Sequence, residues 1–170
     1  MNLFLQAWGF LSAGGTILWW IIAVLAVMLF LLAERWLFLK LEFPRIAQHR
    51  CEQWLQRQER NSWYARVVRE EVLELSREEL YRSFSLIKAL VMVCPMLGLL
   101  GTVTGMIGIF DLLSLHGALW MKFMESGIAR ATIPTLAGMV VALIGLLLFN
   151  RLETAAKRAM NRMADQMVRE

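Results

Sequence analysis

The sequence predicts an all-α integral membrane protein with three transmembrane helices. Hydrophobic residues make up 58% of the 170 residues, and they fall in long blocks instead of at the period of a soluble core. The blocks cover residues 14–33, 89–113 and 127–150. Each block reaches the roughly 20 residues that an α-helix needs to cross about 30 Å of hydrocarbon.

The segment before the first block, residues 1–13, places Leu3, Phe4, Ala7, Trp8 and Leu11 on one helical face. This pattern predicts a short periplasmic helix in the membrane interface, and a frayed terminus is the alternative. The block at 14–33 has the length of a membrane span, whereas the apolar core of a signal peptide is typically about 7 to 15 residues long and follows basic residues. We expect this block to be retained as the first span.

The basic residues predict the orientation of the spans. Of the 18 Lys and Arg residues, 11 lie in residues 34–88 and 5 lie after Asn150, whereas residues 1–33 contain none. By the positive-inside rule, the N-terminus and the 114–126 loop are periplasmic, and 34–88 and 151–170 are cytoplasmic. The net charge of +4 therefore reflects topology and contact with lipid instead of nucleic acid.

Both cytoplasmic parts are predicted to be helical. Residues 63–86 contain no Gly or Pro and carry alternating charges, so the second membrane helix is expected to begin well inside the cytoplasm. After Asn150, apolar residues that include Leu152, Ala156, Met160 and Met163 recur at helical spacing. The third helix should therefore continue through 151–170 as an amphipathic tail whose methionines pack against neighbouring helices.

No motif for catalysis, a cofactor or a metal is found. The glycine-rich run lacks the spacing of a dinucleotide turn or a P-loop. The two histidines, His49 and His116, are predicted on opposite sides of the membrane, so they cannot share a metal or a catalytic triad within one chain. Cys51 and Cys94 are not placed in an oxidising compartment, and a structural disulfide is not expected. The sequence thus predicts neither an enzyme nor a cofactor-binding protein.

Small residues recur at spacings of three and four in the second and third spans. Such spacing lets helix backbones approach closely. Tight packing within one bundle is the leading explanation, and the number of small-residue faces also favours an oligomer. The predicted packing residues are Gly98, Gly101, Gly105 and Gly138.

Two hydroxyls lie near one depth in the membrane. Thr102 is close to the middle of the second span, and Thr135 is slightly outward of the middle of the third. A Thr in a membrane helix commonly donates to its own backbone. The matching depth nevertheless favours a shared polar surface, whereas Thr104 is expected to point toward a helix neighbour.

Asp111 and Arg130 are the ionisable residues inside the spans, both near the outer ends. Each is costly alone in a membrane, so an ion pair between them is one prediction, and separate extension toward the interface is the alternative. Neither residue can complete a proton relay through the middle of the membrane.

Two motifs resemble a known family. The first is Gly98-Leu-Leu-Gly-Thr-Val-x-Gly-Met106, and the second is Gly127-Ile-Ala-x-Ala-x-x-x-Thr-x-x-Gly138, followed by Asn150. Together they resemble the ExbB/TolQ/MotA proton-channel family over about residues 14–165. The short three-helix layout is most similar to the ExbB type, and the run from Cys94 resembles that of a second TonB system.

The resemblance implies a homo-oligomeric ring, usually a pentamer, around single-span helices of an ExbD-type partner that carry an Asp. The ring would pass motion to TonB and so energise uptake across the outer membrane, for example of siderophore-bound iron. Thr102 and Thr135 correspond to the pore threonines of the family. Arg130 departs from the pattern, because many relatives have an acidic residue there.

The resemblance therefore implies a ring-forming, ExbB-like subunit of a proton-driven transducer in the bacterial inner membrane. Two alternatives remain open, a TolQ-like subunit for envelope maintenance and a non-conducting membrane scaffold. A MotA-like flagellar stator agrees less well, because that type has four spans and a larger cytoplasmic domain.

Overall fold

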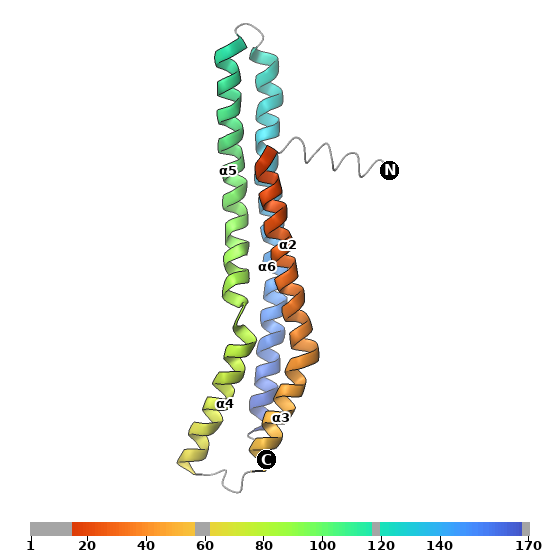
Figure 1. Cartoon of the computed structure of the whole chain (residues 1–170), viewed down its shortest axis with the longest axis vertical. Coiled ribbons are helices and arrows are strands. Elements are labelled where there is room, and N and C mark those ends of the chain that lie inside the picture. The colour runs from red at the N-terminus through yellow and green to blue at the C-terminus, as the bar shows by residue number, and fades with distance from the viewer. Residues whose placement is uncertain (1–14, 57–61, 117–119, 168–170) are drawn as a thin grey trace, which may run out of the picture. The chain divides into compact units, whose positions relative to one another are not determined.

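A computed structural model describes residues 15–56, 62–116 and 120–167 (Figure 1). Side chains are described for these ranges except at residues 15, 112–116, 120–126, 129 and 130. The segment 1–13, with its expected interfacial helix, lies outside the described residues. Every element within the described ranges is a helix: α2 (Gly15–Leu37), the π-helix η1 (Phe38–Glu42), α3 (Phe43–Leu55), α4 (Trp63–Tyr81), α5 (Phe84–His116) and α6 (Trp120–Gln166).

The predicted all-helical membrane class is confirmed by three stretches that are long and apolar enough to cross a bilayer. They are Thr16–Leu55, Trp63–Asp111 and Ala131–Gln166. Both helices at the predicted 114–126 loop extend into it, since α5 ends at His116 and α6 begins at Trp120. A helix needs only its own backbone hydrogen bonds, so it need not end where the apolar block ends.

The chain forms two compact units. Residues 1–29 with 89–146 make up the first, which we call the apolar unit, and residues 30–88 with 147–170 make up the second, the charged unit.

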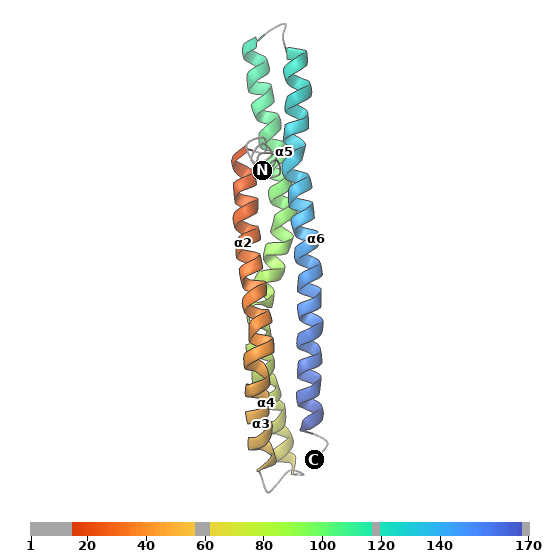
Figure 2. The same cartoon turned by 90° about the vertical axis from the view of Figure 1, so that its right-hand side faces the viewer.

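In the apolar unit, α5 and α6 lie side by side in both views (Figures 1 and 2). Helix α2 packs against both, since an added Cβ at Gly101 on α5 would lie 3.4 Å from Ile17, and one at Gly145 on α6 would lie 2.6 Å from Met28. Its buried side chains are mainly apolar and include Leu18, Ile21, Met28 and Cys94. Its outer surface is also apolar, with large side chains more than half exposed on every helix, among them Trp20, Met96, Leu99, Phe110, Leu136 and Leu143. A surface of this kind suits contact with lipid or with another apolar helix.

The π-helix η1 lies between α2 and α3 and precedes Pro44. Proline has no backbone N–H, and its ring crowds the carbonyl four residues earlier, here that of Lys40. A π-turn widens the helix locally, which relieves this crowding. The backbone therefore passes from α2 through η1 into α3 in helical conformation.

In the charged unit, α3, α4 and the last part of α6 pack through a narrow apolar stripe. Cys51 Sγ donates to Gln166 Oε1 at 3.7 Å, joining α3 to α6, and Arg69 donates to the carbonyl of Ala164 at 3.3 Å, joining α4 to α6. Burial raises the pKa of the Cys51 thiol. The stripe consists of Leu152, Ala156, Met160 and Met163 on α6 and Met167 directly after it, all buried, so its methionines serve packing.

The predicted helix over 63–86 is broken at Arg82 and Ser83, between α4 and α5. Arg35, only 8% exposed, stands at this break and donates to the carbonyl of Glu79 at 3.3 Å and to Ser83 Oγ at 2.8 Å. The last carbonyls of a helix have no intrahelical donor, so the guanidinium supplies one for α4. Tyr81 and Phe149 both contact the Phe84 ring edge to face.

Arg35→Ala is expected to destabilise the charged unit by about 1.5–3 kcal/mol, because it removes charge-assisted hydrogen bonds on the last turn of α4 and at Ser83. Thermal unfolding in detergent, with hydrogen exchange of the amides of residues 79–86, measures the effect. Arg82→Ala is the matched control, since Arg82 is exposed and makes no hydrogen bond or ion pair in the described part of the chain. Equal stability of the two variants would contradict the capping role.

Candidate functional site

The two predicted hydroxyls lie against the same turn of α5. Thr135 Oγ1 donates across to the carbonyl of Gly98 at 2.9 Å. Gly98 is four residues before Thr102, so the same carbonyl is the ordinary helical acceptor for the Thr102 N–H. The Thr102 hydroxyl donates to the carbonyl of Leu99 at 2.7 Å within its own helix. Both side chains are half-buried, and each hydroxyl oxygen keeps lone pairs that can accept a further hydrogen bond.

Thr104 has a different environment. It is exposed in the single chain, and its hydroxyl donates to the carbonyls of Leu100 and Gly101 in its own helix, at 3.0 and 3.1 Å. No described helix of the same chain therefore covers Thr104, and the helix neighbour expected for it from sequence is not found among the described residues.

Glycines bring the backbones of α5 and α6 close together. An added Cβ at Gly98 would lie 3.0 Å from both the carbonyl oxygen of Pro134 and the Cα of Thr135. An added Cβ at Gly138 would lie 2.6 Å from the carbonyl oxygen of Cys94. Because the atoms in the way belong to the backbone, no rotamer change could relieve these contacts.

The close contact extends along several turns of both helices. An added Cβ at Gly105 would lie 2.8 Å from the Cβ of Ala131, and one at Gly101 would overlap the ring of Pro134, which is fully buried. We call this set the glycine interface: Cys94, Gly98, Gly101 and Gly105 on α5 with Ala131, Pro134, Thr135 and Gly138 on α6. The glycine interface lies within one chain.

Gly108 continues the same spacing on α5 but differs in its surroundings, since nothing lies within 4 Å of its added Cβ. Spacing alone could not separate Gly108 from the glycines of the interface.

Asp111 is the one Asp, Glu, Lys, Arg or His among the described side chains of the apolar unit, and it is exposed. Its predicted partner, Arg130, lies outside the described side chains, so the ion pair stays a prediction. The described part of the apolar unit therefore holds hydroxyls near mid-span but no carboxylate there.

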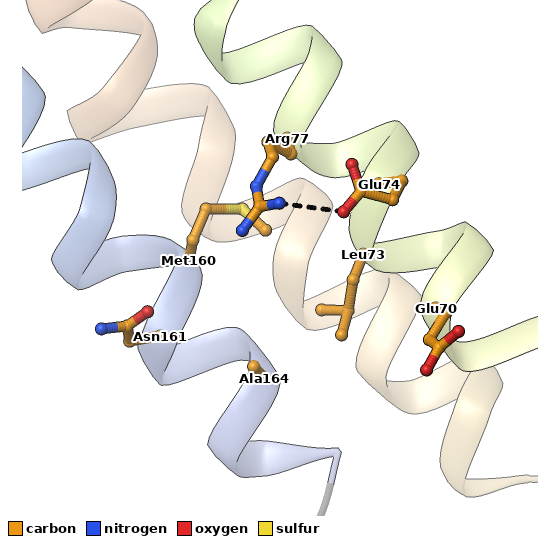
Figure 3. A pocket seen from close by; sticks show the side chains of 7 residues that line it. All are labelled: Glu70, Leu73, Glu74, Arg77, Met160, Asn161 and Ala164. Atoms are coloured by element: carbon orange, nitrogen blue, oxygen red, sulfur yellow. Dashed lines mark hydrogen bonds and ion pairs between the residues drawn. The ribbon is translucent and has the colours of Figure 1, made fainter. Parts of the chain in front are cut away.

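The charged unit holds a groove of about 340 Å³ between α4 and α6 (Figure 3). Leu73, Met160 and Ala164 form its apolar part, and Glu70 and Asn161 lie at its edges with the ion pair Glu74–Arg77, 2.9 Å long. Within the described residues, no group of three or more His, Cys, Asp or Glu could hold a metal ion.

Sequence reasoning missed two features of these units. One is Arg35, a buried donor at the α4–α5 break. The other is the carbonyl of Gly98, the acceptor for Thr135. A signal for Arg35 is its place two residues after the apolar block at 14–33, although nothing in the sequence indicates the side of the helix that it occupies.

The fold and site thus define a helical membrane protein with three spanning helices and a glycine-packed pair beside two hydroxyls. Residues 40–165 match the MotA/TolQ/ExbB proton channel family, and the chain belongs to this family. It is also 34% identical over 99 residues to a protein of Synechocystis sp. whose name assigns it to the ExbB-like biopolymer transport proteins (ExbB-like 1). That alignment covers 56% of this chain and 39% of the relative. No solved structure matches the chain.

Gly138→Ala is expected to destabilise the apolar unit by about 1–3 kcal/mol, since a methyl group would be forced against the Cys94 carbonyl. Gly108→Ala is the matched control on α5, and it should be neutral or stabilising by up to about 1 kcal/mol, because alanine favours a helix over glycine. Thermal unfolding in detergent measures both. A Gly138→Ala protein as stable as the parent would refute the close approach of α5 and α6.

Proposed function

We propose that the chain is the ring-forming subunit of an ExbB-like, proton-driven transducer of the bacterial inner membrane. The family match supports proton-channel chemistry, and the name of the Synechocystis relative supports the ExbB-like branch. The orientation with an outer N-terminus and an inner C-terminus follows from the distribution of Lys and Arg.

The proposal rests on one observation about the described part of the apolar unit: it has two hydroxyls near mid-span and no carboxylate beside them. The hydroxyls of Thr102 on α5 and Thr135 on α6 both lie at the same turn of α5. Both side chains are half-buried, and both hydroxyls can accept further hydrogen bonds. Proton transfer needs a titratable group, and the described part of the apolar unit has only Asp111, near the end of α5. We therefore propose that the carboxylate comes from another chain.

The lack of a mid-span carboxylate indicates the chemical group that a partner would supply. A single-span helix with one carboxylate, of the ExbD type, would lie inside a homo-oligomeric ring, a pentamer in our proposal, so that its Asp meets the Thr hydroxyls and their waters. Protonation and release at that Asp would drive the motion passed to TonB and energise uptake across the outer membrane. The Thr side chains hydrogen-bond to this Asp in either protonation state without holding charge themselves.

The Thr102→Val, Thr135→Val double variant is expected to lower proton-driven transport about tenfold or more, since each Val keeps the shape but removes a donor and acceptor near a charge. Growth on a siderophore or haem that requires TonB measures transport, and native mass spectrometry of the co-purified complex measures assembly. Thr104→Val is the matched control, because Thr104 is exposed and donates to its own helix, and its effect should be small.

Thr135→Ser separates the chemical role from packing, because Ser keeps the hydroxyl that reaches Gly98 and loses only a methyl group. Transport should be close to that of the parent in Thr135→Ser and impaired in Thr135→Val. Normal growth of the double Val variant with intact assembly would remove the pore assignment.

We also propose that Asp111 and Arg130 pair near the outer ends of the spans, within a chain or between subunits. A double-mutant cycle with Asp111→Asn and Arg130→Gln should show a coupling of about 0.5 kcal/mol or more in thermal stability. Additive effects of the two substitutions would show that the side chains act independently.

A further inference from the structure

The charged unit divides its charges by sign between two helices. Helix α4 carries five glutamates against three arginines, whereas residues 147–166 of α6 carry four basic residues against two acidic ones. The outer surface of α3 is balanced, with Arg45 and Glu52 both exposed. Helix α4 thus has a net negative charge, and the 147–166 part of α6 has a net positive charge.

Ion pairs within the unit leave several of these charged side chains unpaired. The ion pairs within the described part of the unit are Arg50–Glu79, Arg77–Glu74 and Lys157–Glu153. Other charged side chains of α4 and α6 make no ion pair or hydrogen bond there and are exposed; they include Glu71 and Glu78 on α4 and Arg151, Arg158 and Arg162 on α6. The two glutamates are seven residues apart, as are Arg151 and Arg158, so each set lies on one face of its helix. Arg66 and Glu70 on α4 and Asp165 on α6 are also exposed without such a partner, and Asp165, seven residues after Arg158, adds one carboxylate to the face that carries the three arginines.

The acidic face of α4 is distinct from the side that meets α6 in the same chain. Figure 3 shows Glu70, Leu73, Glu74 and Arg77 along the groove that faces α6. Glu71 and Glu78 do not line this groove, and each is one helical position, about 100° of rotation, beyond a residue that does. Their carboxylates are therefore directed away from the α6 of their own chain.

The two faces lie at matching levels. Arg69 meets Ala164, and Phe84 meets Phe149, so these contacts align the antiparallel helices α4 and α6. Counting two residues from the first contact puts Glu71 level with Arg162. Counting six residues from the second puts Glu78 level with Ala155, between Arg151 and Arg158.

We infer that the acidic face of α4 (Glu71 and Glu78) docks against the basic face of α6 (Arg151, Arg158 and Arg162) on a second copy of this chain. Rotation about an axis along the membrane normal keeps every residue at its own level, so Glu71 meets the neighbour's Arg162, and Glu78 meets the neighbour's Arg151 and Arg158. Two different faces make a heterologous contact, which closes into a ring when repeated. The inference rests on the ring of the proposed function and specifies the surfaces that form it.

Cysteine cross-linking tests the contact directly. In a full-length background with Cys51→Ala and Cys94→Ala, the pair Glu71→Cys with Arg162→Cys is oxidised in detergent. A heterologous contact gives a ladder of cross-linked species up to the full ring, whereas either single-cysteine variant gives no ladder. The matched control is Glu52→Cys with Arg162→Cys, which tests a contact through α3 instead of α4. Glu52 is exposed on α3, and its neighbour Cys51 contacts Gln166 on α6.

Each outcome decides the assignment. A ladder from the Glu71–Arg162 pair alone supports it. A ladder from the Glu52 control alone assigns the contact to α3 and overturns it, as does dimer formation by the single Glu71→Cys variant. If no ladder forms while native mass spectrometry shows an intact ring, the assignment of the contact to these two faces is wrong, but the proposed function is not affected. A monomeric parent protein would overturn the ring as well.

Charge reversal supplies an independent measurement. Glu71→Arg with Glu78→Arg should weaken subunit association about tenfold at low salt, as should Arg158→Glu with Arg162→Glu, and combining all four should restore it. If the basic face serves anionic lipid instead, only the Arg reversals reduce the amount of phosphatidylglycerol that stays bound to the detergent-purified protein in native mass spectrometry, and the combination restores nothing. That result would overturn the inference.

Discussion

The close approach of α5 and α6 is the contact on which the rest of the apolar unit depends. Carbonyl oxygens of Cys94 and Pro134 stand where side chains would otherwise be, at Gly138 and Gly98. In a membrane there is no hydrophobic force to bring two apolar helices together, so dispersion contacts between closely spaced backbones must do so. The same spacing places the Thr135 hydroxyl within reach of the Gly98 carbonyl, a bond that larger side chains at the interface would prevent.

Use of the glycines inside one chain has a consequence for the outer surface. The exposed side chains of the apolar unit, such as Met96, Leu99 and Leu143, are large and flexible and suit lipid or apolar partner helices. Partner specificity is then expected from elsewhere in the chain. The half-buried hydroxyls can recognise a partner carboxylate, and the sign-separated faces of the charged unit can recognise a second copy.

The sequence predicted the all-helical class and the three apolar stretches because block hydrophobicity depends on composition alone. It could not predict the break at Arg82 and Ser83, since no Gly or Pro lies there and the break is stabilised by Arg35 from a distant helix. The helical continuation of α6 beyond Asn150 agreed with its apolar spacing. For Thr102 and Thr135, depth along each span indicated a common level, but only the fold shows that both meet the turn beginning at Gly98.

The central claim is that this chain supplies packing and hydroxyls while a partner supplies the titratable group. Proton flux into liposomes, driven by an imposed membrane potential and followed with an internal pH dye, tests it most directly. Liposomes with this chain alone should be as proton-tight as empty ones, and flux should appear only when a single-span partner with a membrane carboxylate is reconstituted with it. Proton flux through the chain alone would contradict the account.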